Sequence, residues 1–273
     1  MKKILLSLLG LLLGLSGNAQ LKSPSDFLGY ELGTQFTRHH QVIDYVNHVA
    51  ENSDFAQTTP YGKTNEDRTL QLVYLSAPEN LAQLETMRKD HLRSIGYAEG
   101  AKETTKEFSI VWLSYNVHGN ESTSTEAALK TLHTLVTEKQ DWLENLIVIM
   151  DPCINPDGRD RYVNWYNQVK STPFDSSPLA NEHFEDWPGG RYNHYYFDLN
   201  RDWAWLSQKE SQQRLPNYLA WMPQIHVDFH EQGVDSPYYF APAVEPYHEV
   251  ITDFQRDFQA TIAKNHSRYF DKE

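Results

Sequence analysis

The chain has 273 residues, with 24 Lys and Arg against 37 Asp and Glu and a formal net charge of −13. Removing Lys2 and Lys3 with an N-terminal leader would take this charge to about −15. Phosphate binding requires clustered Lys and Arg, so this acidic balance excludes nucleic acid as a partner. Cys153 is the sole cysteine, which excludes an internal disulfide.

The N-terminus has the pattern of a secretory signal peptide. Lys2 and Lys3 precede an apolar run over residues 4–15, and Gly17 and Ala19 frame a cleavage site. The run is shorter than the roughly 20 apolar residues of a membrane span, which disfavours a retained anchor. We therefore expect 1–19 to be a signal peptide. The remaining 20–273 should form one secreted or periplasmic domain with no membrane contact.

Short apolar segments alternate with helical patterns in this domain. Segments rich in β-branched and aromatic residues predict four strands, at residues 69–75, 108–115, 146–150 and 225–229. A helix is predicted over 123–138, opened by a capping box of Thr123 and Glu126. Another is predicted where Val250, Phe254, Phe258 and Ile262 repeat every four residues. Strands alternating with helices indicate an α/β fold.

The segment 151–205 shows no sustained periodicity and is crowded with Asn, Asp, Pro, Gly, Trp and Tyr. A long irregular segment in a compact domain is usually functional or disordered, and disordered segments are poor in aromatic residues. We expect a functional loop. Its aromatic residues either line a cleft or, as is more common, pack locally.

His118 and Glu121 lie between the strand predicted to end at 115 and the helix predicted from 123. A histidine and a carboxylate on such a turn can both reach one zinc ion. By itself the pair also fits a surface turn with a solvated glutamate. A catalytic zinc site needs a third ligand, and His230, at the end of the last predicted strand, is the best candidate.

His226 is the alternative third ligand, although it lies inside the strand, where a packed or hydrogen-bonded histidine is expected. Asp228 lies between the two histidines in the sequence. It is either a hydrogen-bond partner of a ligand histidine or an ordinary carboxylate at a strand end.

Two further clusters lie in the segment 151–205. Asn155-Pro156-Asp157-Gly158 is typical of a tight turn and requires no function. In the cluster 197–203, Arg201 is suited to binding a carboxylate with both arms of its guanidinium. An internal ion pair of Arg201 with Asp198 or Asp202 is the alternative.

Taken in order, His118-x-x-Glu121, Asn155-Pro156-Asp157-Gly158, Asp198-Leu199-Asn200-Arg201 and Asp228-Phe229-His230 resemble the carboxypeptidase A-like family of zinc metallopeptidases. The resemblance spans residues 61–230, beginning with a Tyr-Gly-Lys turn. It implies a mixed, mostly parallel central sheet of eight strands flanked by helices, one Zn²⁺ per chain, and removal of C-terminal residues from peptides. The substrate would be a peptide or protein with a free C-terminal carboxylate.

The resemblance also implies roles for individual residues. His118, Glu121 and His230 would bind zinc, and Asn200 and Arg201 would hold the terminal carboxylate of the substrate. A further arginine of the family polarises the scissile carbonyl. Arg161, which follows the Asn-Pro-Asp-Gly sequence more closely than is usual in the family, is our choice for it, and Arg191 is the competitor.

The family's general base is a glutamate on a late strand, well after the third zinc ligand. The chain ends at Glu273, and Glu231 should point away from His230 on the opposite strand face, so we assign no base. We expect the chain to be incomplete at its C-terminus and to lack the family's last strands. Two alternatives to a carboxypeptidase stay open. One is a zinc amidohydrolase acting on N-acyl amino acids or cell-wall peptides, and the other is a non-catalytic peptide-binding protein.

Overall fold

The computed structural model describes residues 20–233, 235–236 and 241–272. The predicted signal peptide, 1–19, lies outside the described residues. The described chain forms two compact units, one ending at Glu231 and the other beginning at Gln232. In the part of the chain that is described, no helix has the length and apolar character needed to cross a membrane.

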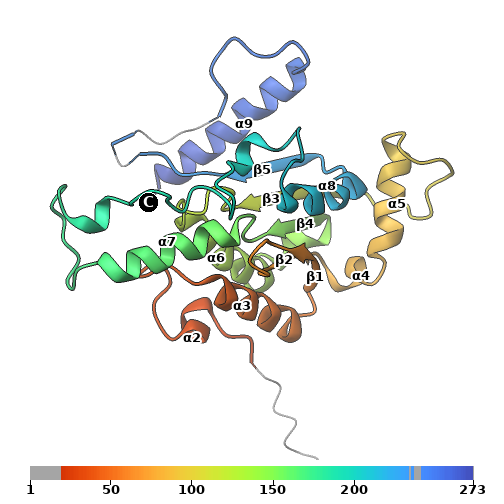
Figure 1. The fold of residues 1–273 in the computed structure, drawn as a ribbon. Coiled ribbons are helices and arrows are strands. Elements are labelled where there is room, and N and C mark those ends of the chain that lie inside the picture. Colours follow the sequence, from red (N-terminus) through yellow and green to blue (C-terminus); the bar gives the residue numbers. More distant parts are fainter. Residues whose placement is uncertain (1–19, 234, 237–240, 273) are drawn as a thin grey trace, which may run out of the picture. The chain divides into compact units, whose positions relative to one another are not determined.

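A mixed sheet with the strand order β1-β2-β4-β3-β5 forms the centre of the first unit (Figure 1). Its strands are β1 (Ala56–Lys63), β2 (Thr69–Leu75), β3 (Ser109–Tyr115), β4 (Leu146–Asp151) and β5 (Ile225–Phe229). β2 pairs antiparallel with β1 and β4, whereas β3 runs parallel to β4 and β5. The predicted mixed α/β architecture is confirmed. Half of the described strand pairings are parallel, whereas the resemblance implies a mostly parallel sheet. Five strands are described, whereas the resemblance implies eight.

The four predicted strands are present within one residue of their expected ends. β1 is missing from the prediction because its sequence contains Pro60 and Gly62, which are unusual inside a central strand. Both residues are tolerated because β1 lies at the edge of the sheet, with an irregularity in its register between them. In this order β3 lies between β4 and β5, which both run parallel to it.

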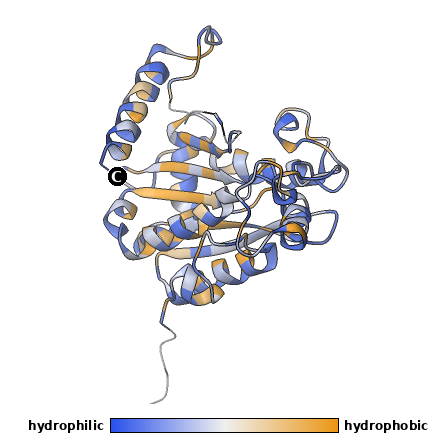
Figure 2. Ribbon diagram, turned by 90° about the vertical axis from the view of Figure 1, so that its left-hand side faces the viewer, coloured by the Kyte–Doolittle hydropathy of each residue, from blue (hydrophilic) through white to orange (hydrophobic). Residues whose placement is uncertain are grey.

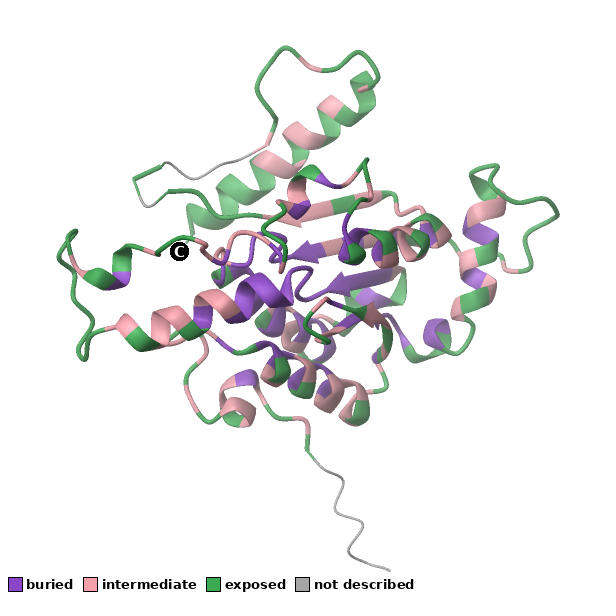
Figure 3. Cartoon of the chain, in the orientation of Figure 1, coloured by how far each residue is buried: buried purple, intermediate pink, exposed green. Residues whose placement is uncertain are grey.

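Helices cover both faces of the sheet. In the first unit they are α2 (Pro24–Leu28), α3 (His39–Asn52), α4 (Pro78–Leu81), α5 (Leu84–Ser94), α6 (Thr123–Thr137), α7 (Pro156–Val169) and α8 (Lys209–Trp221). Three short 3₁₀ segments are η1 (Gln140–Glu144), η2 (Asn181–His183) and η3 (Leu199–Arg201). Figure 3 shows that burial is concentrated in the central strands, and Figure 2 shows their hydrophobic stretches.

Alternation along the strands divides the core into two layers. Val73 and Leu75 of β2 pack with the apolar faces of α3 and α6. Leu72 and Tyr74, which point to the other side of the same strand, pack with Trp221 of α8. The central strands are therefore buried on both faces, which explains their nearly continuous apolar sequences.

The segment 151–205 is more regular than its composition suggests, because α7 occupies residues 156–169 of it. Asn155 is the N-cap of α7 and accepts a hydrogen bond from the Gly158 N–H, and Pro156 is its first residue. An asparagine cap followed by proline is a helix-start signal. Interpreting this sequence as an isolated tight turn was wrong.

The second unit contains α9 (Asp253–Phe270). Thr252 caps it, and Gln255 completes a capping box. The helix predicted from the four-residue apolar repeat is thereby confirmed from Phe254 onward, whereas Val250 precedes the first turn.

Candidate active site

The candidate site lies at the carboxyl ends of β3 and β5. These strands are parallel neighbours, with Tyr115 opposite Phe229. The loop after β3 carries His118 and Glu121, and His230 directly follows β5. In α/β proteins, the loops at the carboxyl ends of neighbouring parallel strands meet and form binding sites. This topology brings together residues that are more than 100 positions apart in the sequence.

His118, Glu121 and His230 present ligand atoms that all lie within 4.8 Å of one another. The carboxylate of Glu121 lies between the two rings, 2.7 Å from His118 Nδ1 and 3.1 Å from His230 Nδ1. Burial favours a higher pKa for Glu121. The hydrogen bonds from the two histidines outweigh this effect and lower the pKa to about 2. The described geometry thus groups the three predicted ligands around one point.

Each histidine also contacts an aspartate through its other ring nitrogen. His118 Nε2 lies 3.1 Å from Asp198 Oδ1, and His230 Nε2 lies 2.8 Å from Asp228 Oδ2. The Asp228 contact, followed by that of Glu121, raises the pKa of His230 to about 10. A carboxylate on the outer nitrogen is the usual way to orient a ligand histidine. Of the two alternatives for Asp228, the structure shows the contact with a candidate ligand histidine, and Asp198 makes the same contact with His118.

His226, the alternative third ligand, has different surroundings. Its Nε2 lies 2.9 Å from Ser114 Oγ, and its ring meets that of Trp203 edge to face. It is therefore a hydrogen-bonded strand histidine, as expected. Glu231 does not turn back to His230, because its carboxylate accepts a hydrogen bond from the Thr123 N–H at the start of α6.

Three glycines let three segments meet at the backbone. A Cβ on Gly119 would lie 2.3 Å from the carbonyl carbon of Gly158 and 2.4 Å from the carbonyl oxygen of Gly190. A Cβ on Gly158 would lie 2.4 Å from the same Gly190 oxygen. Contacts this short leave no room for a side chain. The loop with His118, the start of α7 and the segment before Arg191 are therefore packed directly against one another.

This packing brings Arg191 to the candidate ligands. Its guanidinium lies 3.6 Å from Glu121 Oε1 and 2.9 Å from Asp198 Oδ2. Its backbone carbonyl accepts hydrogen bonds from Asn155 Nδ2 and from the Gly119 N–H. Arg191, the competitor of Arg161, thus contacts the cluster.

Arg161, our choice from the sequence, is directed elsewhere. Its guanidinium donates to the backbone carbonyls of Gly189, Tyr192 and Asn193. The central carbon of its guanidinium, Cζ, lies 5.1 Å from the centre of the Tyr196 ring. These contacts support the segment that carries Arg191. The sequence could not separate the two arginines, because both follow the Asn-Pro-Asp-Gly motif and the backbone packing of the three glycines brings Arg191 to the site.

Asn200 and Arg201 lie on η3, beside the cluster. Asn200 Nδ2 is 3.5 Å from His230 Nε2, and Asn200 Oδ1 accepts a hydrogen bond from Trp203 Nε1. The amide therefore turns its donor side toward the site. Arg201 is exposed and donates to the Asn200 carbonyl. Within the described part of the chain it forms no ion pair with Asp198 or Asp202, and its guanidinium is available to a ligand.

Comparison with known proteins identifies the family. The family model "Zinc carboxypeptidase" matches residues 42–220, which is more than half of the chain. The chain belongs to the zinc carboxypeptidase family. No curated protein matches it.

Solved carboxypeptidase structures have a similar fold. A proposed carboxypeptidase from Burkholderia mallei is 19% identical with a TM-score of 0.52, and the match covers 81% of this chain and 45% of that one. A metallo-carboxypeptidase from Burkholderia cenocepacia is 17% identical with a TM-score of 0.52, covering 81% and 47%. The present chain therefore spans less than half the length of either structure, and the likeness concerns the fold.

A second cluster of candidate ligands comprises Glu66, Asp157 and His194. The guanidinium of Arg68 already pairs with both carboxylates, at 2.5 Å from Glu66 and 2.8 Å from Asp157. A cation would have to displace this arginine. The cluster is therefore explained as an internal ion-pair network of this chain.

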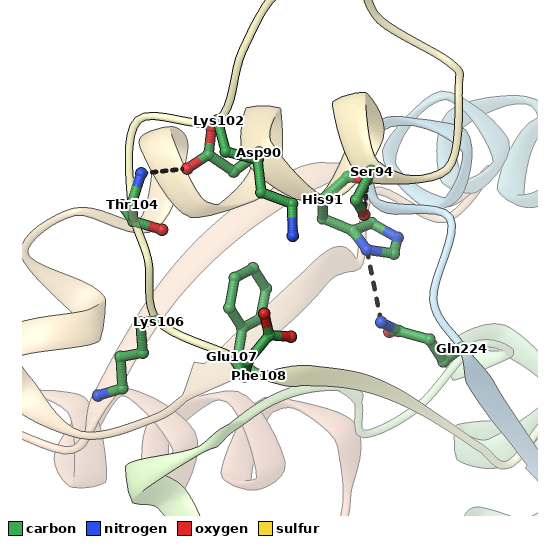
Figure 4. Close-up of a pocket in the computed structure, with 9 residues that line it drawn as sticks. All are labelled: Asp90, His91, Ser94, Lys102, Thr104, Lys106, Glu107, Phe108 and Gln224. Atoms are coloured by element: carbon green, nitrogen blue, oxygen red, sulfur yellow. Dashed lines mark hydrogen bonds between the residues drawn. The ribbon is translucent and has the colours of Figure 1, made fainter.

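A polar cavity of about 100 Å³ lies between α5 and the segment before β3 (Figure 4). His91 and Gln224 line it and contact each other, and His91 Nε2 also contacts the Met222 carbonyl. Asp90 accepts hydrogen bonds from the backbone of Glu103 and Thr104. The cavity adjoins the amino end of β3, whereas the candidate ligands follow its carboxyl end, so the cavity belongs to a different part of the molecule.

Asp151 at the end of β4 should make stability depend on pH. Burial raises its pKa from 3.8 to about 6, against the lowering effects of the Tyr61 hydrogen bond and the Arg214 charge. The folded state therefore binds more protons than the unfolded state between about pH 4 and 6, and the free energy of unfolding falls as pH rises through this window. At roughly 1.4 kcal/mol per pKa unit, the loss from this group is up to about 3 kcal/mol.

Asp151→Asn removes the titrating group and can still accept the Tyr61 hydrogen bond. Urea unfolding at pH 4.5 and pH 7.5 should show a smaller loss of stability for the variant than for the parent protein. Equal losses in both proteins would contradict the assignment of the titration to Asp151.

Proposed function

We propose that the chain is a zinc-dependent metallocarboxypeptidase that binds one Zn²⁺ through His118, Glu121 and His230 and hydrolyses the C-terminal peptide bond of peptides. The observation that carries this proposal is the convergence of the three ligand atoms, with an aspartate on the outer nitrogen of each histidine. Family membership supports the same activity.

The donor set fits zinc. Two imidazoles and one carboxylate are a usual protein ligand set of catalytic zinc, which keeps a further position open. Asp198 and Asp228 bind the Nε2 atoms and thereby leave both Nδ1 atoms directed at the site. A bound zinc ion supplies a Lewis acid that polarises the scissile carbonyl and makes water more acidic.

The charged groups around the ligands suit a substrate with a free carboxylate. The Asn200 amide, oriented by Trp203, and the exposed guanidinium of Arg201 offer donors for the terminal carboxylate. Arg191, which contacts the cluster, would donate to the scissile carbonyl oxygen as negative charge develops there. We therefore assign this role to Arg191 in place of Arg161.

A pair of peptides tests the proposed reaction. The chain loaded with Zn²⁺ is incubated with one peptide in two forms, with a free and with an amidated C-terminus, and products are identified by mass spectrometry. Release of the last residue from the free form alone supports a carboxypeptidase. Cleavage of N-acyl amino acids without cleavage of peptides indicates the amidohydrolase. Binding of the free peptide without cleavage of any substrate indicates a peptide-binding protein and contradicts the proposal.

Arg201→Ala sharpens this test. It removes one donor for the terminal carboxylate without touching the candidate zinc ligands, and hydrogen bonds to charged groups contribute about 1.5–3 kcal/mol. We expect KM for the free peptide to rise by about tenfold or more, with zinc content unchanged. A KM equal to that of the parent protein would exclude Arg201 from carboxylate binding.

A further inference from the structure

The loop that carries His118 and Glu121 is closed by one side chain. Asn116 is fully buried, and its amide donates to the carbonyls of His118 at 2.7 Å, Gly119 at 3.3 Å and Glu121 at 2.9 Å. Its own backbone is in the left-handed region, with φ of 57°. Asparagine tolerates this conformation better than most residues. The turn between β3 and the ligands therefore depends on Asn116 for both its backbone and its internal hydrogen bonds.

Arg159 of α7 holds the other side of Asn116. This arginine is also fully buried, and its Nη1 donates to Asn116 Oδ1 at 3.3 Å and to the Ser122 carbonyl at 2.8 Å. Its Nη2 lies 2.5 Å from Glu126 Oε1. Glu126, expected from the sequence to cap α6, is instead the buried counterion of Arg159. Asn116 and Ser122 lie on either side of His118 and Glu121, at the two ends of what is called the ligand loop here. Both thus accept a hydrogen bond from the Arg159 guanidinium.

The network extends to a segment before the region that matches the family. The Thr37 N–H and hydroxyl donate to the two oxygens of Glu126, at 2.7 and 2.6 Å, and Arg159 Nε donates to the Thr37 carbonyl. The matched region begins at residue 42. Part of the support beneath the ligand loop therefore comes from residues that the family model does not cover.

We propose that Asn116, held by Arg159 and the Glu126–Thr37 pair, is a positioning residue that fixes the ligand loop before metal binds. The inference rests on the proposed zinc site. Hydrogen bonds to three successive parts of the loop order it in advance, so that little conformational freedom is lost when His118 and Glu121 bind a cation. Without them, ordering the loop would weaken metal binding.

Asn116→Gly tests this role, because glycine accepts the positive φ and removes only the side chain. Residues that support metal ligands typically contribute about 10–100-fold to metal affinity. We expect the variant to bind Zn²⁺ at least about tenfold more weakly, measured by competition with a chromophoric chelator. The visible spectrum of the Co²⁺-substituted protein should also change, since it reports on coordination geometry.

Asn80→Gly is the matched control. Asn80 is fully buried as well, and its amide donates to Ser76 and to the carbonyls of Leu143 and Glu144, next to the amino end of β4. Asn80→Gly removes the same side-chain atoms as Asn116→Gly, at the opposite end of the sheet from the candidate ligands. We expect it to lower the stability of the metal-free protein while zinc affinity and the Co²⁺ spectrum stay as in the parent protein.

The outcomes separate the positioning role from the proposed function. If Asn116→Gly binds Zn²⁺ with unchanged affinity and an unchanged Co²⁺ spectrum, the positioning role is overturned. If the parent protein binds neither metal, the proposed zinc site fails instead. Should Asn116→Gly not fold, Arg159→Lys replaces it. A lysine keeps a cation beside Glu126 but lacks the planar fork of donors that contacts Thr37, Asn116 and Ser122 at once. The same loss of affinity is then expected, and its absence overturns the inference.

Discussion

Arg191→Ala should lower kcat for a free peptide by about 10²–10³-fold, the usual effect of removing one donor to a developing oxyanion. Arg191 contacts Glu121 and Asp198, whereas Arg161 is engaged by backbone carbonyls of the segment 189–193. Arg161→Ala should therefore lower kcat less. Its main effect should be to loosen the segment 189–193, which carries Arg191. Added guanidinium ion should restore part of the activity of Arg191→Ala, because that variant retains the space for it.

Steady-state kinetics of the two alanine variants, with zinc content measured in each, decide between these arginines. A larger loss of kcat in Arg161→Ala, with zinc retained, would contradict the assignment of Arg191. It would restore the role that the sequence suggested for Arg161.

Gly158→Ala should destabilise the chain by about 2–3 kcal/mol, as overpacking of a well-packed site commonly does. The added Cβ would lie 2.4 Å from the Gly190 carbonyl oxygen and 2.5 Å from that of Tyr192. Neither backbone atom can move without shifting the segment that carries Arg191. A loss of stability would be informative, because replacing glycine by alanine inside a helix ordinarily stabilises the helix by roughly 0.5–1 kcal/mol.

Gly62→Ala provides the control for this substitution. The nearest atoms to a Cβ on Gly62 belong to the Gln213 side chain, which can move away at the cost of its two hydrogen bonds with the Lys63 backbone. Thermal unfolding should show a lower Tm for Gly158→Ala, by roughly 2–4 °C for each kcal/mol, and a smaller change for Gly62→Ala. An unchanged or higher Tm for Gly158→Ala would contradict the close packing of the three glycines.

The sequence predicted well those features that depend on local pattern. β2, β3 and β4 carry nearly continuous apolar residues, because both faces of these strands are covered, whereas β5 is shorter and more polar. The candidate ligands lie in the loop after β3 and directly after β5. The hydrophobic pattern therefore located the strands, and the topology then brought the ligands together.

The features that were missed depend on contacts between distant segments. The position of Arg191 follows from the backbone contacts of Gly119, Gly158 and Gly190, which no periodicity reveals. Glu126 had the correct spacing for a capping box, but a buried arginine offers it a stronger partner than a helix N-terminus. Asn155 and Pro156 did signal the start of α7, and the turn-like composition around them obscured that signal.

Zinc content is the most direct test of the central claim, that His118, Glu121 and His230 form one metal site. The chain and its His118→Ala, His230→Ala and His226→Ala variants would be purified, dialysed against limited Zn²⁺ and analysed by elemental mass spectrometry. We expect one zinc per chain in the parent protein and in His226→Ala, and loss of zinc in the other two. Absence of zinc from the parent protein, or zinc unaffected by loss of His118 or His230, would contradict the account.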